Sequence, residues 1–403
     1  MVASPMVEKG VAVLALILIL PIVSSSGVIY TNNGIVTHEI LCTHIDELQF
    51  DGDNANESVA YQVGLGPRIP ESNASFELRA SIAENLSGWE IENQSHILAG
   101  LEIVNLEATL NAGAGNTVVL MAHYDTRQVS DEETDENLSL IPVPGANDGA
   151  SGVAVLLELG RLIPTMNLSH EVRLVFTDVE DQGNIITGGV SLPWASGSQM
   201  WTENLTDEEV ENISSLIVVD MIGDSNLTLT RTTPGNETLW QAVDLMAISL
   251  GMVADQKDCN GNNGTGQMDL NTSIGIWDDH VPPLARGIPA IDIIDVKYGS
   301  DEVLSGHWHT QNDTIDKVSS QSLESVGRLV ELGLRSLVFS EISETIAEDK
   351  DEEQEVEIIE VIETETEESD LQSTIIGTLI ILMLFATIAT AAFIVFAENE
   401  GEL

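Results

Sequence analysis

Residues 117–125 read TVVLMAHYD, a short apolar run that ends in a histidine and a carboxylate. Similar runs, rich in β-branched and apolar residues and bounded by Gly, Asn or Asp, predict further strands. They are 101–106, 172–177, 216–221, 227–230 and 290–295. Stretches with helical periodicity alternate with them at 150–163, 238–250 and 320–339. This alternation predicts an α/β fold, with a largely parallel sheet covered by helices on both faces.

Polar residues gather where the predicted strands end, which is where active sites form in such sheets. Six segments carry them: MAHYD at 121–125, GANDGASG at 145–152, FTDVEDQG at 176–183, VVDMIGD at 218–224, WDDHVPP at 277–283 and HWHTQNDTIDK at 307–317. Each segment also has a purely structural interpretation, as a turn, a helix cap or a solvated acidic loop. The functional interpretation therefore depends on the segments acting together.

Two strand ends point to metal ligands. His123 and Asp125 lie on the same side of an extended chain. A metal-bound histidine needs an acceptor for its other ring nitrogen, and Asp125 would supply one. Asp220 lies inside an apolar run, where a bare carboxylate is costly to bury unless it is paired or metal-bound.

The other candidate ligands come from three more segments. Asp148 precedes a predicted helix among small residues, where its carboxylate could bridge two cations. We expect Asp181 to bind metal and Glu180 to accept a proton from water. With His309, the chain would offer two histidines and three carboxylates, a donor set that zinc accepts. Two metals that share Asp148 would lower the pKa of a bridging water and polarise a carbonyl.

In this order, the six segments resemble the zinc exopeptidase family that includes leucyl-type aminopeptidases, glutamate carboxypeptidases and glutaminyl cyclases. The resemblance spans about 61–339 and starts with LGPRIP at 65–70. It implies a three-layer fold with a mixed, mostly parallel sheet. It also implies one metal on His123, Asp148 and Asp220, a second on Asp148, Asp181 and His309, Glu180 as general base, Asp125 as the partner of His123, and Asp279, His280 and Trp308 beside the substrate.

Three departures from the family pattern bear on these expectations. Asp181 stands where many aminopeptidases have Glu, and the loop 130–144 is long and acidic. The segments with Asp278-Asp279-His280 and Trp308-His309 resemble glutaminyl cyclases as much as aminopeptidases. Since cyclases can hold a single zinc with similar residues, we expect zinc but leave open whether two ions bind or one.

Both ends of the chain indicate export and membrane attachment. The apolar run 11–23 is typical of a signal peptide within 1–26, or of an uncleaved anchor. The uncharged apolar run 375–397 is long enough for a transmembrane helix at 374–397. The Glu-rich segment 344–373 predicts a solvated stalk between that helix and a catalytic domain at 27–343, and 398–403 forms a short tail. We expect a single-pass protein of the cell membrane, or a two-pass one if the N-terminal run is retained, with its catalytic domain outside the cell.

The amino-acid composition of the chain limits the kinds of molecule that it is expected to bind. The chain has 66 acidic and 14 basic residues, a formal net charge of −52, which disfavours nucleic acid and anionic lipid. Many Asn-x-Ser/Thr sequons suit an exported, glycosylated surface. The two cysteines, Cys42 and Cys259, could form one disulfide, but their spacing does not decide it. Without a Cys-x-x-Cys pair, a metal would be held by histidine and carboxylate.

Three functions follow as hypotheses. The first is an aminopeptidase that hydrolyses N-terminal residues of extracellular peptides with zinc-activated water. The second is a glutaminyl-peptide cyclotransferase, which cyclises N-terminal Gln. The third, from another class, is a non-catalytic surface receptor on a stalk. The complete set of candidate metal ligands argues against the receptor.

Overall fold

The computed structural model describes residues 28–342, apart from residue 33. The predicted signal peptide or anchor (1–26), stalk (344–373), transmembrane helix (374–397) and tail (398–403) all lie outside the described residues. Within residues 28–342, no helix combines the length and the apolar character that crossing a membrane requires.

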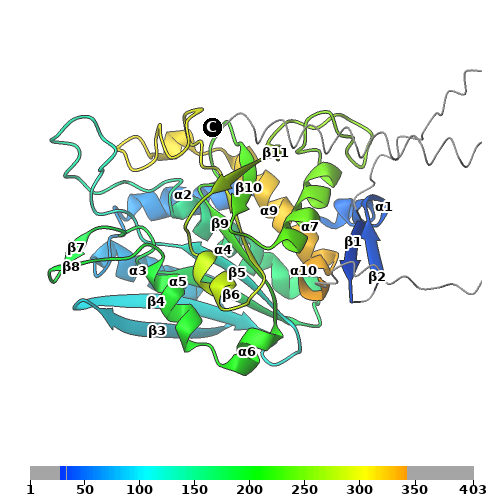
Figure 1. The fold of residues 1–403 in the computed structure, drawn as a ribbon, viewed down its shortest axis with the longest axis horizontal. Coiled ribbons are helices and arrows are strands. Elements are labelled where there is room, and N and C mark those ends of the chain that lie inside the picture. Colours follow the sequence, from blue (N-terminus) through cyan, green and yellow to red (C-terminus); the bar gives the residue numbers. More distant parts are fainter. Residues whose placement is uncertain (1–27, 33, 343–403) are drawn as a thin grey trace, which may run out of the picture. The chain divides into compact units, whose positions relative to one another are not determined.

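A six-stranded sheet forms the centre of the domain, with the strand order β12-β9-β5-β6-β4-β3 (Figure 1). Four neighbouring strands, β12, β9, β5 and β6, run parallel; β4 pairs antiparallel with β6, and β3 pairs antiparallel with β4. The six strands are β3 (Glu90–Leu98), β4 (Leu101–Leu110), β5 (Thr117–His123), β6 (Glu171–Thr177), β9 (Ile213–Asp220) and β12 (Ala290–Ile294). The expected α/β fold with a mixed, mostly parallel sheet is confirmed.

The apolar run of strand β5 does not alternate with polar residues, because both faces of the strand are buried. All seven of its residues are buried. Val118 and Leu120 belong to the core cluster on one face of the sheet, and Val119 and Met121 to the cluster on the other. A strand with helices on both faces buries successive side chains in opposite directions, so the residues from Val118 to Ala122 are all apolar. At about 25 cal/mol per Å² of buried apolar surface, such strands supply much of the folding free energy.

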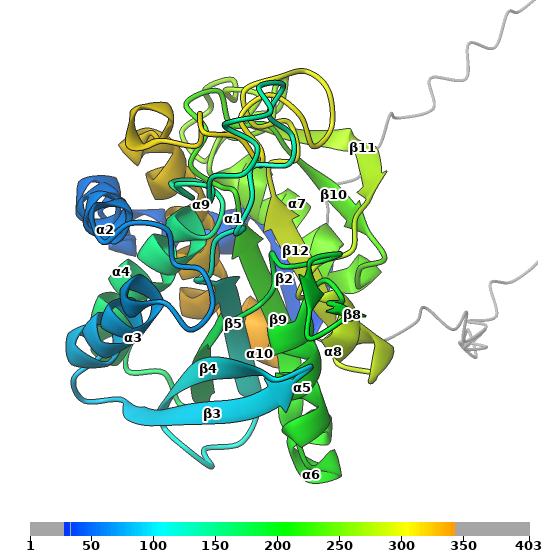
Figure 2. The same cartoon turned by 90° about the vertical axis from the view of Figure 1, so that its left-hand side faces the viewer.

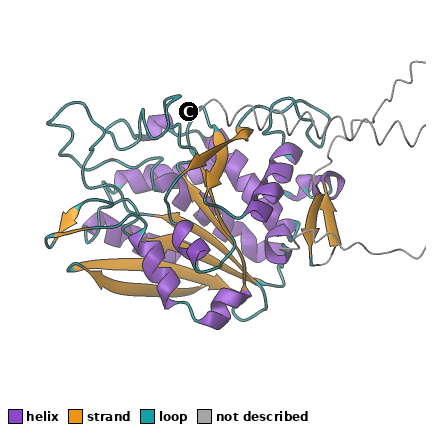
Figure 3. Cartoon of the chain, in the orientation of Figure 1, coloured by secondary structure: helices purple, strands orange, loops and turns teal. Residues whose placement is uncertain are grey.

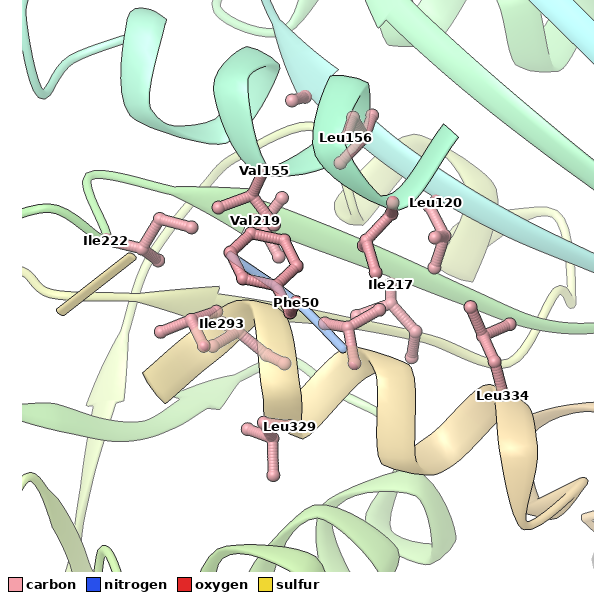
Figure 4. Packing of buried hydrophobic residues seen from close by; sticks show 14 of the residues in the cluster. Phe50, Leu120, Val155, Leu156, Ile217, Val219, Ile222, Ile293, Leu329 and Leu334 are labelled. Atoms are coloured by element: carbon pink, nitrogen blue, oxygen red, sulfur yellow. The ribbon is translucent and has the colours of Figure 1, made fainter. Parts of the chain in front are cut away.

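Helices cover both faces of this sheet (Figures 2 and 3). Residues of α2, α3, α4, α7 and α9 join the larger core cluster, which Figure 4 shows around Phe50. Residues of α5, α6 and α8 pack on the opposite face. The helices are α1 (His38–Cys42), α2 (Gly52–Gly64), α3 (Asn73–Asn85), α4 (Ala150–Met166), α5 (Ser196–Asn204), α6 (Asp207–Asn212), α7 (Glu237–Ser249), α8 (Val281–Ala285), α9 (Ser320–Arg335) and α10 (Val338–Glu341).

Three two-stranded sheets complete the described structure. They are β1 (Val28–Thr31) with β2 (Gly34–Thr37), β7 (Ile186–Thr187) with β8 (Val190–Ser191), and β10 (Leu229–Thr233) with β11 (Met268–Gly275). A disulfide joins Cys42 at the end of α1 to Cys259 in the loop after α7, with the Cα atoms 5.3 Å apart. The two cysteines are therefore paired with each other, which their spacing in the sequence does not decide.

Most predicted elements are present with shifted ends. The predicted strand 101–106 extends to Leu110, and the predicted strand 227–230 begins later, at Leu229. The single helix predicted at 320–339 is wrong at its end, because α9 stops at Arg335 and Leu337 adopts a left-handed φ of 60° before α10 begins. Strands β3 and β11 and helices α2 and α3 were not predicted.

Candidate active site

The six predicted chemical residues meet at the carboxyl ends of β5, β6 and β9. His123 is the last residue of β5, and Asp220 is the last of β9. Glu180 and Asp181 follow β6, while Asp148 precedes α4, and His309 comes from the loop after β12. All six side chains are buried. The convergence expected from the strand ends is therefore present.

One group of donors consists of His123, Asp148 and Asp220. Nε2 of His123 lies 3.1 Å from Oδ1 of Asp220 and 3.2 Å from Oδ1 of Asp148. One donor atom from each of the three residues falls within 4.8 Å of the others. Such spacing suits a shared cation at about 2.0–2.2 Å from each donor.

A second group shares Asp148 with the first. Nε2 of His309 lies 2.8 Å from Oδ1 of Asp181 and 3.7 Å from Oδ2 of Asp148. These three residues also offer donor atoms within 4.8 Å of one another. The other carboxylate oxygen of Asp181 and Oδ2 of Asp148 are buried without a hydrogen-bond partner among the described residues. Because buried carboxylates need compensation, both groups fit a borderline divalent metal such as zinc.

Asp125 orders the acidic turn after β6. Its carboxylate accepts hydrogen bonds from the backbone N–H groups of Glu180 (3.1 Å) and Asp181 (3.2 Å) and from Nε2 of Gln182 (3.0 Å). The same carboxylate lies 3.4 Å from Nδ1 of His123. Asp125 thus connects His123 to the turn that carries the other two acids.

Glu180 is in an environment that favours its protonated form. Burial raises the pKa of this carboxyl well above its usual value, and the charge of nearby Asp278 adds to the effect. A carboxyl group with a raised pKa can exchange protons near neutral pH.

A cavity of about 300 Å³ opens over these groups. Its wall combines carboxylates with large apolar side chains, among them Trp194, Trp277, Trp308, Ile276, Ile294 and Leu304. Glu180 and Asp278 are also part of the lining. An apolar cavity with a few convergent charged groups is the usual form of a small-ligand site.

Of the predicted substrate-contacting residues, Trp308 lines this cavity, but Asp279 and His280 do not. Both are buried behind it. Asp279 accepts a hydrogen bond from the hydroxyl of Thr177. The neighbouring Asp278 lies in the cavity wall, and contact of Asp279 and His280 with substrate stays a prediction.

Two positioning groups were missed from sequence. Asp131, in the long acidic loop, lies with Oδ1 3.2 Å from Nδ1 of His309 and accepts from Nε of Arg127 at 2.7 Å. Burial raises the pKa of Asp131, but the hydrogen bonds from His309 and Arg127 outweigh burial and hold this pKa well below its usual value. Asp313 accepts from the backbone N–H groups of Asn147 (2.8 Å) and Asp148 (3.1 Å). No local pattern singles out either carboxylate among so many acids.

Comparison with known proteins agrees with this arrangement. Aminopeptidase YwaD of Bacillus subtilis is 23% identical over 244 residues, covering 59% of this chain but only 45% of that protein. The glutaminyl-peptide cyclotransferase of Bos taurus is 23% identical over 331 residues, covering 73% of this chain and 86% of the relative.

Solved structures of an exopeptidase and of a glutaminyl cyclase are similar to this chain. A Zn-dependent exopeptidase from Parabacteroides distasonis superposes with a TM-score of 0.63 and 29% identity, over 72% of this chain and 99% of its own. The glutaminyl cyclase of Porphyromonas gingivalis gives 0.62 and 29%, over 72% and 98%. The family model for peptidase family M28 matches residues 105–332, more than half of the chain. This chain therefore belongs to peptidase family M28, as its resemblance to zinc exopeptidases implied.

Proposed function

We propose that this protein is a zinc-dependent aminopeptidase that removes N-terminal residues from peptides. The observation that carries the proposal is the pair of donor groups that share Asp148 beneath a cavity containing Glu180. In this proposal His123, Asp148 and Asp220 hold one ion. Asp148, Asp181 and His309 hold a second.

Zinc, when bound, would lower the pKa of a water molecule and polarise the scissile carbonyl. A residue of the chain would then transfer the proton of the attacking water. Glu180 accepts a proton from the attacking water and delivers it to the leaving amine. The raised pKa of Glu180 supports both halves of this transfer, because the protonated form must also be accessible.

The cavity supports a substrate with a free α-amino group. Asp278 and Glu180 line it together, and their carboxyl oxygens would accept hydrogen bonds from an ammonium group. Three tryptophans in the wall favour a bulky apolar side chain at the N-terminal position. A cavity of about 300 Å³ suits one residue rather than an extended peptide.

The proposal is tested with the purified full chain and a panel of aminoacyl-nitroanilides. We expect cleavage that a chelator abolishes and added zinc restores, with large apolar residues preferred. Zinc-loaded protein that cleaves no member of the panel would refute aminopeptidase activity.

Cyclisation of N-terminal Gln is the second candidate. It is favoured by Asp278, which stands beside Glu180 and offers a second carboxyl group for moving protons without an attacking water. Mass spectrometry of a Gln-initiated peptide separates the two reactions, since cyclisation releases ammonia and hydrolysis releases the free residue. A zinc-loaded chain that performs neither reaction would favour the receptor hypothesis.

We further propose that the domain is held outside the cell. Support comes from the apolar runs 11–23 and 375–397 at the two ends and from the sequons between them. Protease added to intact cells should remove the domain, whereas resistance that persists until the cells are lysed would contradict this location.

A further inference from the structure

A second cluster of potential metal ligands lies behind the cavity wall. Asp278 precedes α8, His280 is the residue at the start of that helix, and Asp292 is the middle residue of β12. One donor atom from each falls within 4.8 Å of the others. None of these three residues belongs to the two groups around Asp148.

Asp292 is an unusual residue for its position. Every residue of β12 is buried, and the side chain of Asp292 is 0% exposed. Neither of its carboxylate oxygens has a hydrogen-bond partner among the described residues. Removing a carboxylate from water without a partner costs several kcal/mol, so a compensating group is required.

His280 directs a free lone pair toward this carboxylate. Its Nε2 lies 2.8 Å from the carbonyl oxygen of Pro234, and because a carbonyl only accepts, Nε2 must carry the hydrogen. In the neutral ring, Nδ1 is then an acceptor. This nitrogen is buried without a hydrogen-bond partner and lies 4.0 Å from Oδ2 of Asp292. Two acceptors that face each other call for a cation or a proton between them.

The surroundings add mostly negative charge. Burial raises the pKa of Asp292, the charges of Asp278, Asp220 and Asp279 raise it further, and His123 lowers it. Among the ion pairs of the described residues, none joins a Lys or Arg side chain to Asp278 or Asp292.

We propose that Asp278, Nδ1 of His280 and Asp292 bind a further divalent cation, separate from the ions on Asp148. One nitrogen and two carboxylates form a donor set that suits Zn²⁺ or Mn²⁺. Two metal–ligand bonds of about 2.1 Å span up to about 4.2 Å, which accommodates the 4.0 Å between His280 and Asp292. Water would supply the remaining ligands.

Such an ion would have a structural effect on the substrate cavity. It would tie the start of α8 to β12 and fix Asp278, the member of the cluster that lines the cavity. The carboxylate beside Glu180 would then be held in one orientation. This role is independent of whether the reaction is hydrolysis or cyclisation.

The test counts metal ions in the full chain. Wild-type protein, Asp292→Asn and a control, Asp295→Asn, are dialysed to equilibrium against Zn²⁺ or Mn²⁺, and metal per chain is measured by mass spectrometry. Asp295 is a matched control because it is equally buried, but its carboxylate accepts from the backbone N–H groups of Thr228 and Lys297 at 2.8 and 2.9 Å. We expect Asp292→Asn to hold one ion fewer than the other two proteins.

Equal counts in all three proteins would overturn the proposal. If Asp292→Asn does not fold, anomalous diffraction from wild-type crystals soaked in Mn²⁺ decides the question. A peak at bonding distance from Asp292 supports the site, and its absence refutes it. An Asp148→Ala chain that still binds one ion would separate this site from the proposed catalytic one.

Discussion

The contact between Asp131 and His309 gives a quantitative prediction about metal affinity. Replacing Asp131 with alanine removes the acceptor 3.2 Å from Nδ1 of His309, while Nε2, on the other side of the ring, faces Asp181. The ring then loses the group that sets its tautomer and orientation. Loss of such a partner typically weakens metal binding by about 10–100-fold, or about 1.4–2.7 kcal/mol.

The packing effect of this substitution should be small. The Asp131 side chain is 41% exposed, so little buried volume is removed. Arg127 keeps its hydrogen bonds to the carbonyl oxygens of Asp181 and Gly183 at 2.9 and 3.2 Å. Asp131→Asn retains a neutral acceptor and should fall between wild type and the alanine variant.

Competition with a chromophoric chelator measures zinc affinity for these variants, and unfolding of the metal-free proteins measures stability separately. Glu133→Ala is the control, because Glu133 lies in the same acidic loop but accepts from the backbone N–H of Gln311. We expect its zinc affinity to match wild type. An alanine at 131 that leaves affinity within about threefold of wild type, well short of the loss expected for such a partner, would refute the reasoning.

Three further outcomes are expected. Glu180→Gln should lower kcat by about 10²–10⁴-fold with its zinc content unchanged, and an unaltered rate would remove Glu180 from the mechanism. Replacing Cys42 and Cys259 with serine should lower the free energy of unfolding by about 2–5 kcal/mol in urea titrations, because the disulfide closes a loop with a sequence separation of 217. Burial raises the pKa of Asp295 to about 7 in the folded chain. Protonated Asp295 therefore contributes its full stabilisation of the fold below the pKa of the unfolded chain, and this contribution is lost as pH rises through about 7. Asp295→Asn should therefore gain about 4 kcal/mol relative to wild type between pH 4 and pH 8, and a constant difference would contradict that pKa.

The strands that could be predicted are those buried on both faces. Strands β5, β6 and β12 are rich in apolar residues, and almost all of their residues are buried, so their apolar runs mark them in the sequence. Strand β3 lies at the sheet edge, and none of its residues is fully buried. Its sequence EIENQSHIL contains little that distinguishes it from a loop. Its pairing with β4 comes from tertiary structure, which local periodicity does not encode.

The residues of the candidate site also differ in whether the sequence alone could predict them. His123 and Asp220 end buried strands, so strand prediction already places them at one edge of the sheet. Asp131 could not be identified because the loop around it holds several equivalent acids. Its partner, His309, is far away in sequence. The choice between Asp278 and Asp279 likewise depends on which side chain the start of α8 turns toward the cavity.

The order of the donors along the chain has a consequence for folding. Three of the six strands of the central sheet, β6, β9 and β12, lie between His123 and His309 along the chain, and Asp148 must meet both of their groups. A nascent or truncated chain that lacks β12 and the following loop can assemble only the first group. An ion that binds only the native arrangement stabilises it by mass action, so the second ion of the proposed pair would be taken up late. The number of metal ions bound per chain would therefore report whether synthesis and folding of the whole domain are complete.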